Sequence, residues 1–410
     1  MQAGNATNAL LDREAGIYLG TSGDRAAAIL WIAAAGSLGA AVWIGRSTDQ
    51  MSRFFHSYLV AFAWVLSVGL GAVWWVTLQH LVSARWSVAV RRVGELMAAN
   101  MPLLGILALP VVVPVLLGDS TLFPWVDVAA MRADDVLSHK MPYLNATFFA
   151  ARCVVYFGFW SFWSFYLLNR SRDQDSGGKE KLAERLRSVS APAMIGLAIT
   201  ITFAAFDFLM SLDPMWFSTI FGVYFFAGGV VAWHGVLALS LQWLQGKGRL
   251  RQLVTTEHYH DIGKMLFAFT IFWAYIGFSQ FMLIWYGNLP EETTFFIERM
   301  HGSWMTVNVL LIVGHFLVPF LGLLSRHAKR ARKVLAFWAI WMLVMHYVDL
   351  YWLVMPNLDH DGVRLSAMDL LCLAGLGSLV AAATLRRARV GALIPTHDPK
   401  LADSLAFENM

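Results

Sequence analysis

Titratable side chains interrupt several of the long apolar runs of this sequence. Asp207 lies inside one such run, four residues before the turn at 211–216 (SLDPMW), and His234 lies inside the next run. An ionisable group at membrane depth is costly unless it has a partner or water, so it is a functional candidate by default. The chemistry that such groups support is ion pairing or proton transfer. The structural alternative is that Asp207 only ties two helices together.

Other polar residues fall at a similar depth when depth is counted from the middle of each apolar run at about 1.5 Å per residue. They lie near the centre or about 5–9 Å to one side of it, and they are Arg152, Asp207, Gln280, His346, Asp349 and Asp369. Arg152 and Asp207 are on consecutive runs, so an ion pair would make both tolerable in hydrocarbon. A neutral Asp207 is the other solution.

His346 and Asp349 are three residues apart and share one helix face, where a carboxylate can orient or charge an imidazole. His315 lies near the middle of its run, and we predict His234 well toward the end of its run that meets the basic loops. Hydrogen bonds between helices are the structural alternative for each histidine. In depth order these groups form a ladder that could carry protons, and the predicted path is Arg152, Asp207, His234, Glu257, Asp261, Gln280, His315, His346 and Asp349.

Redox and metal chemistry have weaker signals. Cys153 and Cys372 stand alone without a CxxC or CxxCH pattern, so there is no iron–sulfur or c-type haem signature. The HYH at 258–260 lacks the i, i+4 spacing of a helical zinc site, and we predict no metal and no catalytic residue. A b-type haem needs two facing histidines, for which the candidate pairs are His315 with His346 and His56 with His301.

The elements that position these residues are predicted to be membrane-spanning helices. Apolar residues make up 58% of the 410 and charged residues 14%, whereas about 25% of residues are charged in ordinary globular proteins. Because about 20 apolar residues cross the roughly 30 Å of hydrocarbon, the sequence predicts an all-α polytopic protein with ten spans. They are 26–45, 54–80, 95–117, 143–168, 191–212, 216–244, 262–287, 303–325, 334–355 and 365–385.

The loops predict how these helices are oriented. Most of the 31 Lys and Arg residues fall in the tails and loops of one side, which predicts that both termini are cytoplasmic and argues against a nucleic-acid partner. The first residues lack the pattern of a removable signal peptide. We expect residues 169–190 to be a solvated loop with room for a short helix, and residues 118–141 to be a charged surface loop. Four carboxylates of the second loop could face a protein partner: Asp119, Asp127, Asp134 and Asp135.

Three longer stretches resemble a known family. They are DFLMSLDPMWFSTIFGVYFFAGG at 207–229, HDIGKMLFAFTIFWAYIGFSQFMLIWYGNLPEET at 260–293 and HFLVPFLGLLSRHAKR at 315–330. They are similar to the ActF-type membrane subunit of bacterial alternative complex III, in the NrfD/polysulfide-reductase membrane-subunit superfamily. The resemblance implies a tail (1–25), an outer helix (26–53), two four-helix bundles (54–212 and 213–355), and a last helix with a cytoplasmic tail (356–410).

The resemblance also implies partners and cofactors in a bacterial inner membrane. The complex would be a quinol:cytochrome c oxidoreductase of the respiratory chain, with a sister NrfD-like subunit, a pentahaem cytochrome c, an iron–sulfur subunit, a monohaem cytochrome c, and in some cases a terminal oxidase. Haems and clusters are expected in those partners, and this chain would hold no covalent cofactor, with room for a quinone or a structural lipid. A proton-translocation role is the primary hypothesis. The alternatives are a quinol-binding subunit, for which the aromatic stretches 157–166 and 272–286 could form a pocket wall instead of packing, and a secondary transporter.

Overall fold

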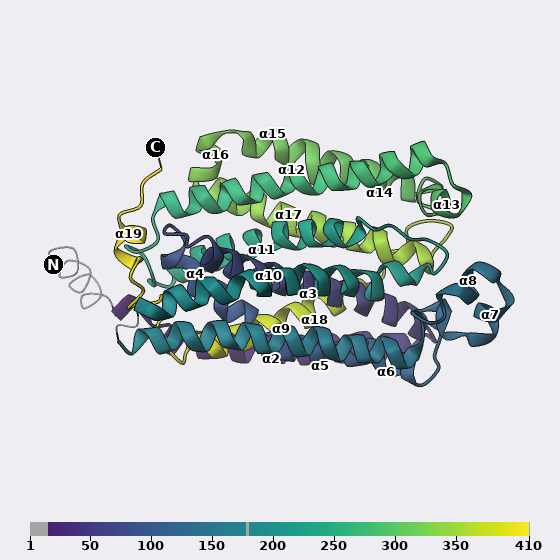
Figure 1. The fold of residues 1–410 in the computed structure, drawn as a ribbon, viewed down its shortest axis with the longest axis horizontal. Coiled ribbons are helices and arrows are strands. Elements are labelled where there is room, and N and C mark those ends of the chain that lie inside the picture. The colour runs from purple at the N-terminus through teal and green to yellow at the C-terminus, as the bar shows by residue number, and fades with distance from the viewer. Residues whose placement is uncertain (1–14, 178–179, 410) are drawn as a thin grey trace.

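The computed structural model describes residues 15–177 and 180–409, and this part of the chain contains helices and no strands (Figure 1). Within it, ten helices or runs of helices are long and apolar enough to cross a membrane. The predicted fold class, an all-α polytopic membrane protein, is therefore confirmed. The assignment of the helices to two four-helix bundles stays a prediction.

The spans follow one another along the chain, and the longest connection, residues 117–145, lies between the third and the fourth. In the first half they are α2 (Ser22–Ser47), α3 (Met51–Leu81), the run α4 (Val88–Ala98), α5 (Met101–Leu107) and α6 (Leu109–Leu116), then α9 (Ala146–Asp175) and α10 (Glu180–Phe208). In the second half they are α11 (Phe221–Gly246), α12 (Thr256–Gly287), the run α14 (Trp304–Leu310), η4 (Leu311–Leu317) and α15 (Val318–Leu324), then α17 (Arg332–Val354) and α18 (Ala367–Ala388). Prolines near the starts of α5, α6 and α15 break two of these spans into runs, because proline cannot donate a helical hydrogen bond.

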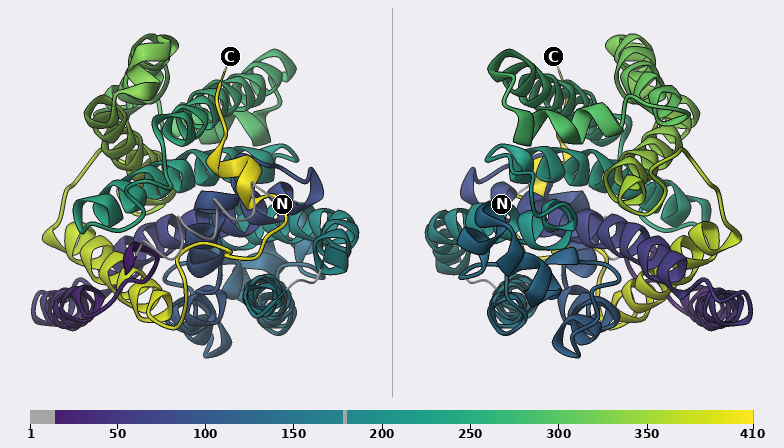
Figure 2. Two further views of the ribbon diagram at one scale, coloured as in Figure 1. Left: turned by 90° about the vertical axis from the view of Figure 1, so that its left-hand side faces the viewer. Right: turned by 90° about the vertical axis from the view of Figure 1, so that its right-hand side faces the viewer.

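Helix α3 is the centre of the molecule. Its most apolar window is 89% buried, and it packs against α4, α10, α11, α17 and α18. A helix that is apolar on all sides belongs in such a core. Helix α2 is the opposite case, because only 17% of its window is buried. It lies with α18 at one edge of the molecule, away from α12 and α15 (Figure 2).

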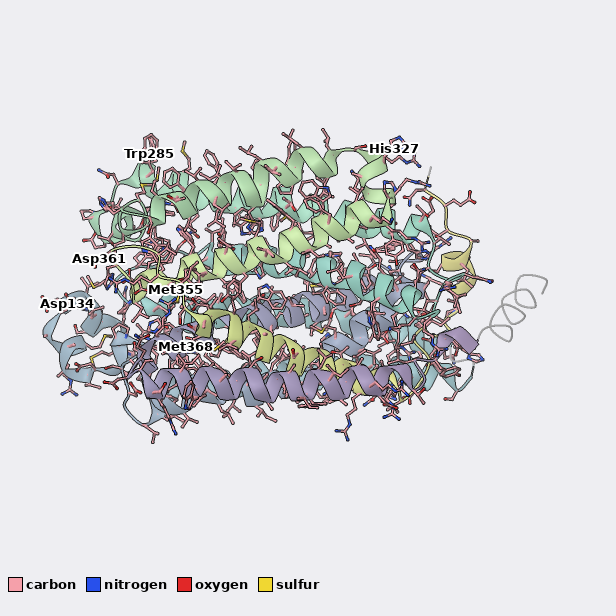
Figure 3. The ribbon with its side chains drawn as sticks, turned by 180° about the vertical axis from the view of Figure 1, so that it is seen from behind. Asp134, Trp285, His327, Met355, Asp361 and Met368 are labelled. Carbon is pink, nitrogen blue, oxygen red and sulfur yellow. The ribbon has the colours of Figure 1, made fainter. Side chains whose placement is uncertain are left out.

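The elongated bundle has two distinct ends. The first described residues, in η1 (Ala15–Ile17), lie with α16 (Arg326–Arg330) and α19 (Leu401–Leu405) at one end, which we call the terminus end. The opposite end carries α7 (Val128–Ala133), α8 (Asp135–Lys140) and α13 (Pro290–Glu298). Figure 3 shows Asp134, Trp285 and Asp361 at the opposite end and His327 at the terminus end.

Some boundaries differ from the predicted ones because polar residues extend the helices. The predicted loop at 169–190 is mostly helix, since α9 continues to Asp175 and α10 begins at Glu180. The third span begins at Val88, well before the predicted residue 95. Residues 1–14 of the predicted tail, residues 178–179 of the predicted loop and residue 410 lie outside the described residues.

The acidic loop at the opposite end uses its carboxylates locally. Asp127 accepts hydrogen bonds from the backbone at the start of α7, and Asp134 does the same for α8. Asp119 accepts a hydrogen bond from the backbone of Thr121 at 2.8 Å. These contacts are two N-caps and a turn. They explain the positions of three of the four carboxylates without a partner protein.

Candidate functional site

The first polar cluster, the Asp207 cluster, is a complete ion pair between α9 and α10. Arg152 Nε and Nη2 donate to the two carboxylate oxygens of Asp207 at 2.8 and 2.7 Å. Tyr156 donates its hydroxyl to the same carboxylate at 2.7 Å. The remaining Arg152 nitrogen, Nη1, donates to the carbonyl oxygen of Tyr143 at 2.9 Å, and the guanidinium lies 3.9 Å from the Tyr143 ring centre. The ion pair predicted from the sequence is therefore present.

The second polar cluster, the Asp349 cluster, is built differently. Asp349 on α17 accepts hydrogen bonds from the Tyr224 hydroxyl of α11 and from Trp273 Nε1 of α12, the second at 3.2 Å. No Lys or Arg among the described residues pairs with this buried carboxylate. Two neutral donors from two helices therefore fix its position without compensating its charge.

His346 lies one turn before Asp349 on α17, but the two do not share a hydrogen bond. Its Nε2 is 2.8 Å from the Ser67 hydroxyl of α3, and that hydroxyl also lies 2.9 Å from the Trp64 carbonyl oxygen. Nδ1 faces Gly228 and has no hydrogen-bond partner among the described residues. A neutral imidazole carries one proton, so Nδ1 is unpaired in either tautomer.

His315 completes the Asp349 cluster from the eighth span. It lies in η4, a π-helical segment, and such wide turns are often found at functional sites. Its ring lies against Trp273, with the ring centres 3.8 Å apart, so Trp273 contacts both Asp349 and His315. Both ring nitrogens of His315 are buried, without a hydrogen-bond partner among the described residues.

The other predicted residues of the path do not join these clusters through direct contacts. His234 is at the middle of α11 and not toward one end, because α11 begins at Phe221 instead of residue 216. Its Nδ1 lies 2.8 Å from the Val230 carbonyl oxygen, and its Nε2 is unpaired within the described chain. Gln280 accepts a hydrogen bond at 3.3 Å from Ser218, beside the SLDPMW turn.

At the terminus end, the predicted acidic residues are already in ion pairs. Glu257 pairs with Arg330, and Asp261 pairs with Lys264 one turn later on α12. Asn409 of the C-terminal segment also donates to Glu257. These contacts favour the structural alternative for both carboxylates, since a paired carboxylate must give up its cation before it can exchange a proton.

A buried charge network on α4 was not predicted from the sequence. Glu95 pairs with Arg91 at 3.2 Å and with Arg92 at 2.9 Å, and Arg91 also pairs with Asp398 of the C-terminal segment at 2.5 Å. Asp175 pairs with Arg92 at 2.8 Å. The i, i+3 and i, i+4 spacing of opposite charges could have indicated the first two pairs. Nothing in the sequence pattern indicates the contact with Asp398.

Networks at the opposite end were also missed. Arg53 of α3 pairs with Asp359 and, at 2.7 Å, with Asp369 of α18. Arg299 has no carboxylate partner within the ranges 15–177 and 180–409. It donates to the carbonyl oxygens of Trp352, Leu353 and Phe295 at 2.9–3.2 Å. Burial lowers the pKa of Arg299 to about 9, so it remains a cation at neutral pH.

The class of protein follows from the fold and these clusters. The chain is a polytopic membrane protein with ten candidate spans and buried charged residues. In the part of the chain that the structure describes, no three His, Cys, Asp or Glu residues are grouped to hold a metal ion. No family model and no curated protein matches the chain.

Proposed function

We propose that this chain conducts protons across the membrane through its buried titratable residues, with the Asp349 cluster as the central station. The observation that carries the proposal is the set of unpaired imidazole nitrogens beside an uncompensated carboxylate. Buried polar groups in proteins are nearly always hydrogen bonded, and ionisable groups inside membrane helices mark ion or proton pathways. His315 and His346 combine both features, and Asp349 is an ionisable group that neutral donors hold without a counter-charge.

The geometry supports proton exchange at two kinds of group. Asp349 can bind one proton without losing an ion pair, because its partners are the neutral donors Tyr224 and Trp273. The imidazoles of His315 and His346 can accept a proton on one nitrogen and release it from the other. Since the three side chains share no direct hydrogen bond, water molecules between them would carry the proton.

The remaining parts of the path have separate places in the proposal. His234, at the middle of α11, would connect the Asp349 cluster with the terminus end. We place the entry there at His260, whose Nδ1 is unpaired among the described residues, because Glu257 and Asp261 are held in ion pairs. The Asp207 cluster would hold α9 against α10 instead of carrying protons.

The wider setting of the proposal comes from the sequence resemblance and the charge bias of the loops. We infer a subunit of a quinol-oxidising respiratory complex in a bacterial inner membrane, with both termini in the cytoplasm. A sister membrane subunit, haem-bearing cytochromes and an iron–sulfur subunit would be its partners. No contact of the described residues specifically favours the quinol-binding or transporter alternatives.

Reconstitution of the purified chain tests the proposal. Liposomes containing the chain and a pH-sensitive dye are given a potassium diffusion potential, and proton uptake is compared with that of protein-free liposomes. We expect uptake to be faster with the wild-type chain and to fall to the protein-free rate with Asp349→Asn. Wild-type uptake equal to that of protein-free liposomes, or unchanged uptake in a folded Asp349→Asn variant, would overturn the proposal.

A further inference from the structure

A separate apolar groove lies between α3, α4, α11 and α18, and Leu19, Leu30 of α2 and Leu393 also line it. Its volume is about 490 Å³, within the range of about 300–1,000 Å³ for small-molecule pockets. The side chains that line it include Trp64, Val68, Val236, Trp243 and Leu385. Among the described residues, no Asp, Glu, His, Lys or Arg lines the groove.

The hydroxyl groups that line the groove offer little to a polar ligand. They belong to Ser240 and Thr384. Thr384 donates to the Val380 carbonyl oxygen at 2.8 Å and accepts a hydrogen bond from Asn100 at 2.6 Å, so its main partners are protein atoms. The groove therefore suits a hydrocarbon chain better than a quinone ring, which needs a donor and a titratable acceptor.

The length of the groove matches one leaflet of a bilayer. Gly377 lies at the middle of α18 and Ala388 at its last turn, and both line the groove. Eleven residues separate them, which corresponds to about 16 Å along the helix. The hydrocarbon core is about 30 Å thick, so the groove runs from its middle to the terminus end.

A basic residue lies at the terminus end of the groove. Lys247 follows the lining residue Leu244 by three positions at the end of α11, so it continues the lining face of that helix. Its side chain is exposed and forms no ion pair with a described residue. Basic residues between spanning helices on one side of a membrane are typical binding sites for anionic lipid head groups.

We propose that this groove binds one acyl chain of an anionic phospholipid, whose phosphate lies beside Lys247. The acyl chain contacts α11 on one side and α18 on the other. Since α2 packs mainly on α18, the bound lipid also supports the attachment of that outer pair to α3. This lipid site is independent of the proposed proton path, because none of the residues of that path lines the groove.

Gly377 provides a selective way to block the groove. A Cβ atom added at Gly377 would meet no atom within 4 Å, and the same is true of Gly39 on the exposed face of α2, outside the groove. Gly377→Leu therefore fills the groove without a clash of its first carbon atom, and Gly39→Leu is the matched control. Ala381→Phe, also on the lining of the groove, is a second blocking variant in case the first does not fold.

Native mass spectrometry of the purified chain with added dioleoylphosphatidylglycerol measures the binding. We expect wild type and Gly39→Leu to retain one lipid per chain, and the blocking variants to bind it at least about tenfold more weakly, because several methylene groups lose their buried contacts. Unchanged binding by a folded blocking variant, or no bound lipid on the wild-type chain, would overturn the proposal.

A second comparison tests the head group. Wild type should bind dioleoylphosphatidylglycerol more tightly than dioleoylphosphatidylcholine, and the variant Lys247→Gln should lose this preference. Equal binding of the two lipids by wild type, or an unchanged preference in Lys247→Gln, would contradict the assigned phosphate position. Displacement of the phospholipid by an equal concentration of a long-chain ubiquinone would show that the groove is a quinone site instead.

Discussion

The Asp207 and Asp349 clusters place similar carboxylates inside the helical bundle, but they treat the charge in opposite ways. Asp207 is held by a bidentate guanidinium and a tyrosine hydroxyl. Asp349 is held by a tyrosine hydroxyl and an indole N–H, with unpaired imidazoles nearby. The first arrangement fixes a charge pair, and the second leaves sites that can gain or lose a proton.

This difference separates a structural ion pair from a functional candidate. Removing one partner of a buried ion pair is costly because the other charge stays buried without a counter-charge. A carboxylate that is held by neutral donors can change its protonation state while the helix contacts stay in place. Buried charge alone therefore does not identify a proton path, and the partners of the charge decide between the two roles.

The largest expected effect on stability comes from Asp207→Asn. It leaves the Arg152 guanidinium buried without a counter-charge, so we expect a loss of about 3–5 kcal/mol in the free energy of unfolding. Asp349→Asn, which strands no cation, should cost clearly less. Unfolding in denaturant monitored by helical circular dichroism gives both values, and equal losses would remove the distinction between the clusters.

A strong effect on proton movement is expected from His315→Gln and His346→Gln. Glutamine is polar but cannot relay a proton as imidazole does, and a positioned proton-transfer group contributes about a hundredfold or more to a rate. Each variant should lower proton uptake in liposomes to a small fraction of the wild-type rate. His56→Gln is the matched control, because His56 is also buried but bonds to the backbone of its own helix. A similar loss in the control would point to general disruption.

A smaller effect is expected from Tyr224→Phe in the Asp349 cluster. The variant removes one of the two hydrogen bonds to the carboxylate, which should lower the free energy of unfolding by about 1–3 kcal/mol. Tyr156→Phe removes the matching bond in the Asp207 cluster, where Arg152 still holds the carboxylate. We expect Tyr224→Phe to change proton uptake and Tyr156→Phe to leave it unchanged. The reverse pattern would assign the path to the Asp207 cluster.

The smallest effect concerns Lys140, which donates to the carbonyl oxygens of Pro214 and Met215 in the SLDPMW turn. Burial lowers the pKa of Lys140 below its ordinary value of 10.5. Between its lowered pKa and 10.5 the unfolded chain binds more protons than the folded chain, so stability should rise with pH in that window. Unfolding measured from pH 8 to 11 should show a smaller rise in Lys140→Met. An identical pH profile in the variant would contradict the contribution of Lys140 to the pH dependence of stability.

The sequence predicted the spans because apolar length is a strong signal. It also predicted the ion pair of Arg152 with Asp207, since two charges on consecutive helices at similar depth have few other partners. The predicted start of the third span was wrong because the charged residues before it are paired inside the protein. Arg91 and Arg92 fall outside the predicted span 95–117, although they lie on α4 and pair with Glu95.

The Asp349 cluster could be predicted only in part. The shared face of His346 and Asp349 follows from their spacing, but their partners come from α3, α11 and α12 and depend on helix packing. Tyr224 and Trp273 belong to aromatic runs in which no single residue stands out. The π-helical segment around His315 and the place of His234 at the middle of α11 depend on local hydrogen bonding and on where a helix begins.

The most direct test of the account compares proton uptake in liposomes for Asp349→Asn and for the double variant Arg152→Met/Asp207→Asn. The double variant removes both charges of the Asp207 cluster, so it strands no buried ion. The account predicts that the double variant retains wild-type uptake and that Asp349→Asn falls to the protein-free rate. Loss of uptake in a folded double variant, with uptake retained in Asp349→Asn, would contradict it.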